Sequence, residues 1–111
     1  MATERERSNR LMLRARDVMD RDHRHELDIA ALANVACCSE AHFIRSFKAT
    51  FGETPHRYLQ RRRIERAMYL LRTTEQSITD ICMNVGFTSL GTFSRTFTDI
   101  VGEPPSRFRQ R

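Results

Sequence analysis

The stretch SEAHFIRSFKATFGETPHR, residues 39–57, recurs fifty positions later as SLGTFSRTFTDIVGEPPSR, residues 89–107. Eight of the 19 aligned positions are identical, whereas ordinary composition would give roughly one or two identities. The identical pairs are Ser39/Ser89, Phe43/Phe93, Arg45/Arg95, Phe47/Phe97, Gly52/Gly102, Glu53/Glu103, Pro55/Pro105 and Arg57/Arg107. Upstream of both stretches, apolar residues align better at an offset of 49, as in Ile29/Ile78, Leu32/Ile81, Ala33/Cys82 and Ala36/Val85. The chain is therefore predicted to contain two copies of one structural unit.

Each copy has the apolar spacing of helices, with residues recurring at intervals of three and four. Ser39 and Ser89 are placed to cap a helix, and Gly52 and Gly102 are placed to end it. The sequence predicts an all-α fold of about seven helices. They are marked by Leu11, Ala15, Val18 and Met19; by residues 28–36; by Phe43, Phe47 and Thr50 on one inner side; by Thr54-Pro55 and the stripe Ile64, Ala67, Met68 and Leu71; by residues 78–85; by Phe93, Phe97 and Ile100; and by Pro104-Pro105.

The composition limits the classes of protein to consider. A chain of 111 residues is the size of one small domain, and it has no apolar run near the ~20 residues that cross a bilayer. The amino terminus has no apolar segment of the secretory type, so the expected location is the cytoplasm. The net charge is +5, and 18 of the 19 basic residues are Arg, whose planar guanidinium suits phosphate and guanine. Inflation of Arg by genomic base composition is the alternative explanation.

Catalysis and metal binding have no support in the sequence. The three cysteines, Cys37, Cys38 and Cys82, are an odd number without the spacing of a metal site, and they are expected to be reduced and structural. The chain contains no nucleophile elbow, phosphate loop or HExxH motif, and its four histidines have no metal spacing. We expect neither an enzyme nor a bound cofactor.

A short helix, a tight turn and a capped second helix form a helix-turn-helix, whose second helix enters the DNA major groove. The side of that helix away from the phenylalanines carries Ala41, Ile44, Arg45 and Lys48 in the first copy, and Gly91, Ser94, Arg95 and Thr98 in the second. Arg45 and Arg95 are predicted to contact bases or phosphates, or else to be solvated or ion-paired. Ile44 is expected either to contact a thymine methyl group or to pack under the fourth helix. Leu90 is expected either to contact a thymine methyl group or to join the core.

The fourth helix is expected to hold the two reading helices. Its roughly 18 residues would span roughly 27 Å, near the ~34 Å between successive major-groove faces. Its start carries Arg57, Arg61, Arg62, Arg63 and Arg66 against Glu65, a run that suits the DNA backbone or forms a solvated surface. The predicted phosphate-contacting residues are Ser39, Lys48, Arg57, Arg61, Arg62, Ser89, Ser94 and Ser106.

The stretch from about residue 27 to residue 108 resembles the DNA-binding domain of AraC/XylS-type transcriptional regulators. The densest marks of the resemblance are Ile81, Gly86-Phe87, Phe93, Arg95, Phe97, Gly102 and Pro105. It implies seven helices, two helix-turn-helix subdomains joined by a long helix, and base contacts at Ala41, Ile44, Arg45, Leu90, Gly91, Thr92 and Arg95. Members commonly have Gly where Cys37 stands, so Cys37 is expected to adopt a positive φ with some strain.

The expected organisation is one DNA-binding unit made of residues 1–52, a linker helix over residues 53–73, and residues 74–111. Its expected partner is double-stranded DNA, bound as a monomer, with RNA polymerase as a further candidate. The alternative function is a helical interaction module that contacts the transcription machinery without reading DNA. Because about 26 residues precede the resemblance, the chain is either a stand-alone regulator or a fragment of a longer protein.

Overall fold

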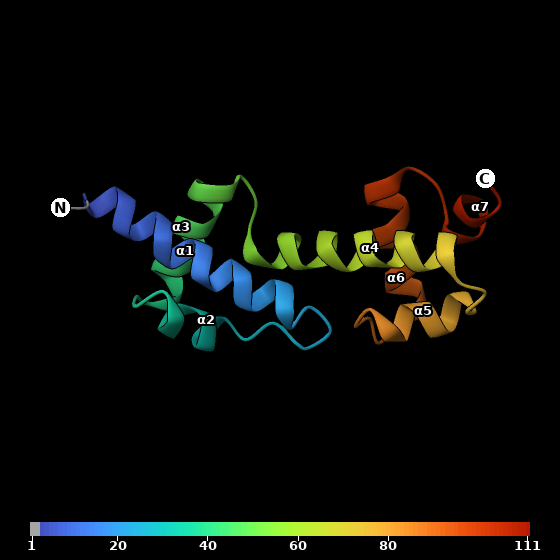
Figure 1. Ribbon diagram of the computed structural model, residues 1–111, viewed down its shortest axis with the longest axis horizontal. Helices are drawn as coiled ribbons and strands as arrows, with labels where there is room; N and C mark the ends of the chain where they lie inside the picture. Colours follow the sequence, from blue (N-terminus) through green and yellow to red (C-terminus); the bar gives the residue numbers. More distant parts are fainter. Residues whose placement is uncertain (1–2) are drawn as a thin grey trace. The chain divides into compact units, whose positions relative to one another are not determined.

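The computed structural model describes residues 3–111 and is all-helical over that range (Figure 1). The helices are α1 (Glu4–Arg21), α2 (Ile29–Val35), α3 (Glu40–Phe51), α4 (Pro55–Thr73), α5 (Ile78–Asn84), α6 (Leu90–Val101) and α7 (Pro105–Arg109). The chain divides into two compact units, the first made of residues up to 22 and 27–59, the second of residues 23–26 and 60–111. No described helix is both long and apolar enough to cross a membrane.

The first unit packs α1, α2, α3 and the start of α4 around one apolar core. Buried in this core are Met12, Ala15, Met19, Leu32, Ala33, Ala36, Phe43, Phe47, Tyr58 and Leu59. Along α3 the aromatic row runs through Phe43, Phe47 and Phe51, and the Phe47 and Phe51 ring centroids lie 4.6 Å apart. The expectation that Thr50 faces inward is wrong. Phe51 takes the last core contact of α3, and Thr50 is left exposed.

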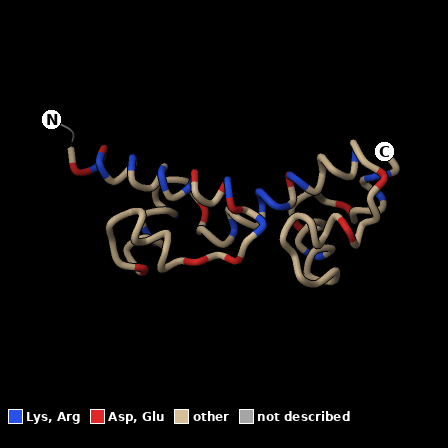
Figure 2. The backbone as a smooth tube through the Cα atoms, turned by 60° about the horizontal axis from the view of Figure 1, so that its bottom comes forward, with Lys and Arg blue, Asp and Glu red and all other residues tan. Residues whose placement is uncertain are grey.

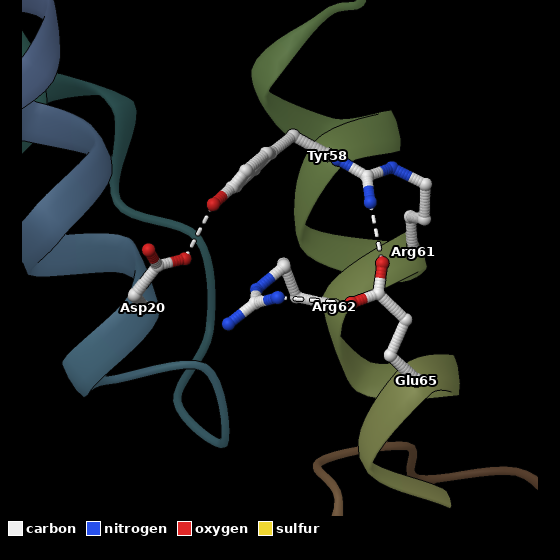
Figure 3. A network of polar contacts seen from close by, with 5 residues as sticks. All are labelled: Asp20, Tyr58, Arg61, Arg62 and Glu65. Atoms are coloured by element: carbon white, nitrogen blue, oxygen red, sulfur yellow. Dashed lines mark hydrogen bonds and ion pairs between the residues drawn. The ribbon is translucent and has the colours of Figure 1, made fainter. Parts of the chain in front are cut away.

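One polar contact ties the end of α1 to the start of α4 within this unit. The Tyr58 hydroxyl donates to Asp20 Oδ1 at 2.5 Å (Figure 3). The Tyr58 ring packs edge-on against Phe47. Thr54 caps α4 as predicted, because its Oγ1 accepts from the Arg57 amide at 3.2 Å. The Tyr58 ring packs into the core and its hydroxyl is held by Asp20, so the side chain has one orientation. The start of α4 is therefore fixed against the core of this unit.

The second unit repeats the arrangement with α5 and α6 in place of α2 and α3. Its buried core consists of Ile64, Ala67, Leu70, Leu71, Ile81, Cys82, Val85, Phe87, Phe93, Phe97 and Phe108. The Phe87, Phe93, Phe97 and Phe108 rings follow one another at centroid distances of 5.3, 5.9 and 5.5 Å. The last of these rings belongs to α7, so the short final helix is held by aromatic packing.

Two arginines of the second unit bind backbone carbonyls. Arg109 of α7 donates to the carbonyl oxygens of Leu71, Thr74 and Gln76, which follow or end α4. These carbonyls include acceptors that a helix C-terminus leaves without an intrahelical partner. Arg109 therefore fixes the exit of the chain from α4.

Arg63 performs a similar task for residues 23–26. Its guanidinium donates to the His23 and His25 carbonyl oxygens, both at 2.6 Å, and lies 5.9 Å from the centre of the Phe87 ring. Burial lowers the pKa of the Arg63 side chain, which nevertheless stays charged. The segment between α1 and α2 is thereby held within the second unit.

The turn inside each helix-turn-helix contains one residue with positive φ. Gly86 has φ +105 in the second copy, and Cys37 has φ +57 at the aligned position of the first. The expected positive φ of Cys37 is thus confirmed, and it places a side chain where glycine is the unstrained residue. Cys37 is exposed, Cys38 is partly buried and Cys82 is buried, and all three are free thiols.

Candidate nucleic-acid interface

Helix α3 presents one buried and one exposed face. Phe43 and Phe47 lie in the core with no exposed surface, and the Ser39 hydroxyl caps the helix by accepting from the His42 amide at 3.2 Å. The opposite face exposes Ala41, Ile44, Arg45 and Lys48. Ile44 is 39% exposed and lies outside the buried core of this unit. This face therefore combines two cations with one apolar side chain.

Helix α6 repeats that division of faces with different side chains. Phe93 and Phe97 are buried, the Ser89 hydroxyl accepts from the Thr92 amide at 3.3 Å, and Gly102 ends the helix in the left-handed conformation. The residues exposed on the helix are Leu90, Gly91, Thr92, Arg95, Thr98 and Asp99, and Ser94 is half-buried. Leu90 is 44% exposed, so it stands outside the core.

The Arg95 side chain lies back along the first turn of α6. Its Nη2 is 3.5 Å from Thr92 Oγ1, and a Cβ added to Gly91 would lie 3.5 Å from Arg95 Nη1. A Cβ at that distance would be in ordinary van der Waals contact with the guanidinium, so the position of Arg95 does not depend on Gly91. Thr92 thus helps to place Arg95, a role that sequence reasoning did not assign to it.

The α4 arginines are distributed among different partners, as Figure 3 shows for part of the run. Arg61 and Arg62 both pair with Glu65, and the Arg62 contact measures 2.9 Å between Nη1 and Oε2. Their side chains remain 41% and 42% exposed. Arg66 lies 5.0 Å from the centre of the Tyr69 ring. The run is therefore partly neutralised or stacked within α4 itself.

Of the remaining predicted phosphate-contacting residues, Ser39, Lys48, Ser89 and Ser106 are exposed, and Arg57 is half-buried. Figure 2 shows that basic positions also follow α1, which the predicted site omitted. Exposed arginines on that helix include Arg5, Arg7, Arg10 and Arg14. The sequence signal for them is the number of arginines on one amphipathic helix, but acidic residues are interspersed among them. Within residues 3–111 no group of His, Cys, Asp and Glu has the arrangement of a metal site.

Each unit thus carries the geometry of a helix-turn-helix, the class of domain that reads DNA through the exposed face of its second helix. A family model described as a helix-turn-helix domain matches residues 32–111. The MmsAB operon regulatory protein of Pseudomonas aeruginosa is 36% identical over 92 residues, which cover 82% of this chain and 30% of that protein. An AraC-type DNA-binding-domain-containing regulator from Chromobacterium violaceum aligns with a TM-score of 0.84 and 28% identity, covering 93% of this chain and 92% of the other.

The fold is also that of the DNA-binding domain of AdpA, a global transcriptional factor whose structure was determined with a target DNA. The TM-score is 0.82 and the identity 24%, with 89% of each chain covered. The chain belongs to the AraC-type family of helix-turn-helix DNA-binding domains. It spans about a third or less of the curated relatives that it matches, with 30% and 34% of two of them covered.

Proposed function

We propose that this chain binds double-stranded DNA sequence-specifically as a transcriptional regulator, with α3 and α6 as recognition helices in successive major-groove segments. The observation that carries the proposal is the recurrence of an arginine at the same position of two helices whose opposite faces are buried. Within the described residues, neither Arg45 nor Arg95 forms an ion pair. Both guanidinium groups are therefore available to an external acceptor.

Arg45 and Arg95 are assigned to guanine, because a guanidinium pairs bidentately with the O6 and N7 atoms of that base. Ala41, Ile44, Leu90, Gly91 and Thr92 complete the proposed base-contacting set. The phosphate contacts are assigned to the serine, lysine and arginine positions predicted from the sequence, Ser39, Lys48, Arg57, Arg61, Arg62, Ser89, Ser94 and Ser106. Arg61 and Arg62 can serve this purpose while they pair with Glu65, because a guanidinium has five N–H donors.

The proposal is tested by measuring the binding of Arg45→Ala and Arg95→Ala to a duplex selected from a random library. Each change is expected to weaken specific binding by about 1–3 kcal/mol, a loss of roughly fivefold to 150-fold, while binding to random duplex is much less affected. Arg14→Ala is the matched control, since it removes one exposed arginine of α1 and the same unit of charge. Equal losses in all three variants would show that the arginines act only through net charge.

The same selection experiment also tests the alternative partner, the transcription machinery. Failure to select any duplex, with the chain folded, would favour an interaction module that contacts the transcription machinery. We propose that one copy of the chain binds one DNA site, because each copy of the repeat supplies one recognition helix. Sedimentation of the complex measures the stoichiometry, and two chains on one selected site would contradict the monomer.

A further inference from the structure

Two exposed apolar side chains stand on the recognition helices. The large apolar residues exposed within residues 3–111 are Leu13, Ile44, Tyr69, Met83 and Leu90, and two of these belong to α3 and α6. A single exposed apolar residue is ordinary on a protein surface. Here, however, each recognition helix carries one, on surface that has to meet the groove if the proposed function holds.

The surroundings of both side chains favour DNA as the group that covers them. Ile44 precedes Arg45 and lies one helical turn before Lys48 and one turn after Glu40, so two cations and one carboxylate surround it, with a net positive charge. Leu90 is the first residue of α6, and the Arg95 guanidinium lies back over Gly91 toward that end of the helix. An apolar partner would have to sit within a strongly negative surface to complement these charges. The major groove offers such a partner only at the C5-methyl group of thymine.

The two residues stand at different levels of their helices. Leu90 aligns with Glu40 in the other copy, and Ile44 aligns with Ser94. Leu90 is thus at the amino-terminal end of its helix, the part of a recognition helix that contacts base edges first, while Ile44 is one turn further along. The two half-sites are accordingly expected to differ in where the apolar contact falls relative to the base read by the arginine.

We propose that Ile44 and Leu90 each contact a thymine methyl group, so that both half-sites require a thymine near the guanine read by Arg45 or Arg95. This inference rests on the proposed function of α3 and α6. Replacing a thymine by deoxyuridine removes only the methyl group and leaves all base-pair hydrogen bonds in place. Loss of one buried methyl contact corresponds to roughly a fourfold weaker Kd.

The experiment begins with selection of a tightly bound duplex from a random library by the 111-residue chain. Each thymine of that duplex is then replaced in turn by deoxyuridine, and the Kd is measured by fluorescence anisotropy. We expect two sensitive positions, each weakening binding roughly fourfold. Ile44→Ala should abolish the sensitivity at one position only, and Leu90→Ala at the other only. Leu13→Ala, which truncates a comparably exposed residue of α1, should leave both sensitivities intact.

The outcomes separate the two proposals. Selection of no duplex would overturn the proposed function itself. A selected duplex whose Kd changes less than twofold at every deoxyuridine position would overturn the methyl contacts and leave DNA binding standing. A uniform loss of affinity in Ile44→Ala or Leu90→Ala, with the deoxyuridine sensitivity unchanged, would show that the residue acts elsewhere, for example against a protein partner. Circular dichroism of each variant confirms that the helices are retained.

Discussion

Gly86 offers a quantitative test of how residues 23–26 are held. A Cβ added at this position would lie 2.9 Å from the Arg24 carbonyl oxygen and 2.9 Å from Arg63 Nε. That Nε donates to the carbonyl of His23, the residue before Arg24, so a shift of either neighbour disturbs this hydrogen bond. Gly86→Ala is therefore expected to displace the Arg63 guanidinium or the segment that it binds.

The magnitude has two parts. An alanine held in the left-handed region costs about 1–2 kcal/mol, and loss of one of the two charge-assisted hydrogen bonds of Arg63 costs about 1.5–3 kcal/mol more. The reduced freedom of the unfolded chain returns about 0.4–1 kcal/mol. The free energy of unfolding should fall by about 3 kcal/mol in Gly86→Ala.

Gly102→Ala is the matched control. Gly102 has φ +98, and nothing lies within 4 Å of a Cβ added there, so only the backbone cost of about 1 kcal/mol applies. Urea denaturation followed by far-UV circular dichroism measures both variants. Tyr58 and Tyr69 lie in different units, and their NMR signals show whether the two units unfold together. If Gly86→Ala falls within about 0.5 kcal/mol of Gly102→Ala, the contact with Arg63 has no energetic role.

Four further predictions concern stability and binding. Cys37→Gly should raise the free energy of unfolding by up to about 1 kcal/mol in urea denaturation, because it relieves a side chain at φ +57; a decrease would contradict the assigned strain. Arg109→Met should lower it by about 2–4 kcal/mol, since three carbonyls lose a charged donor, and a loss below about 1 kcal/mol would contradict the proposed anchoring of the α4 exit. Burial raises the pKa of the Cys82 thiol, so the unfolded chain loses this proton first, and stability should fall as the pH rises above about 8.5; denaturation midpoints that do not decrease would refute this. The slope of log Kd against log salt should be about 0.9 per phosphate contact and should decrease by about one in Lys48→Ala, whereas an unchanged slope would remove Lys48 from the contacts.

The helices and their ends could be predicted because the forces that set them are local. A serine hydroxyl accepts from an amide three residues later in both copies, and a glycine in the left-handed conformation ends both recognition helices. The buried phenylalanines follow from their spacing along one helix face. The outward positions of Arg45 and Arg95 follow from the same spacing, which is why this part of the candidate site was accessible from the sequence.

The partners of the other arginines could not be predicted in the same way. Glu65 lies three and four residues from Arg62 and Arg61, a spacing typical of helical ion pairs, so this sharing had a sequence signal. Arg63 and Arg109 bind backbone carbonyls more than thirty residues away, and every residue has a carbonyl. No pattern of side chains marks such acceptors in advance. Thr50 was predicted to face inward because its spacing places it on the same side of the helix as Phe43. Spacing alone does not show that Phe51 takes the final core contact.

The intramolecular partners of the arginines affect how much each arginine can contribute to DNA binding through charge alone and how much through contacts with specific bases. The net charge of +5 treats all cations alike, yet Arg63 and Arg109 are engaged with carbonyls, and Arg61 and Arg62 share one carboxylate. Glu65 already neutralises part of the charge of Arg61 and Arg62, so a phosphate that they bind gains less Coulomb energy than one bound by an arginine without a carboxylate partner. Among the described residues, Arg45 and Arg95 have no ion pair of this kind. The recognition helices should therefore supply more of the difference between specific and random DNA than the length of the α4 arginine run suggests.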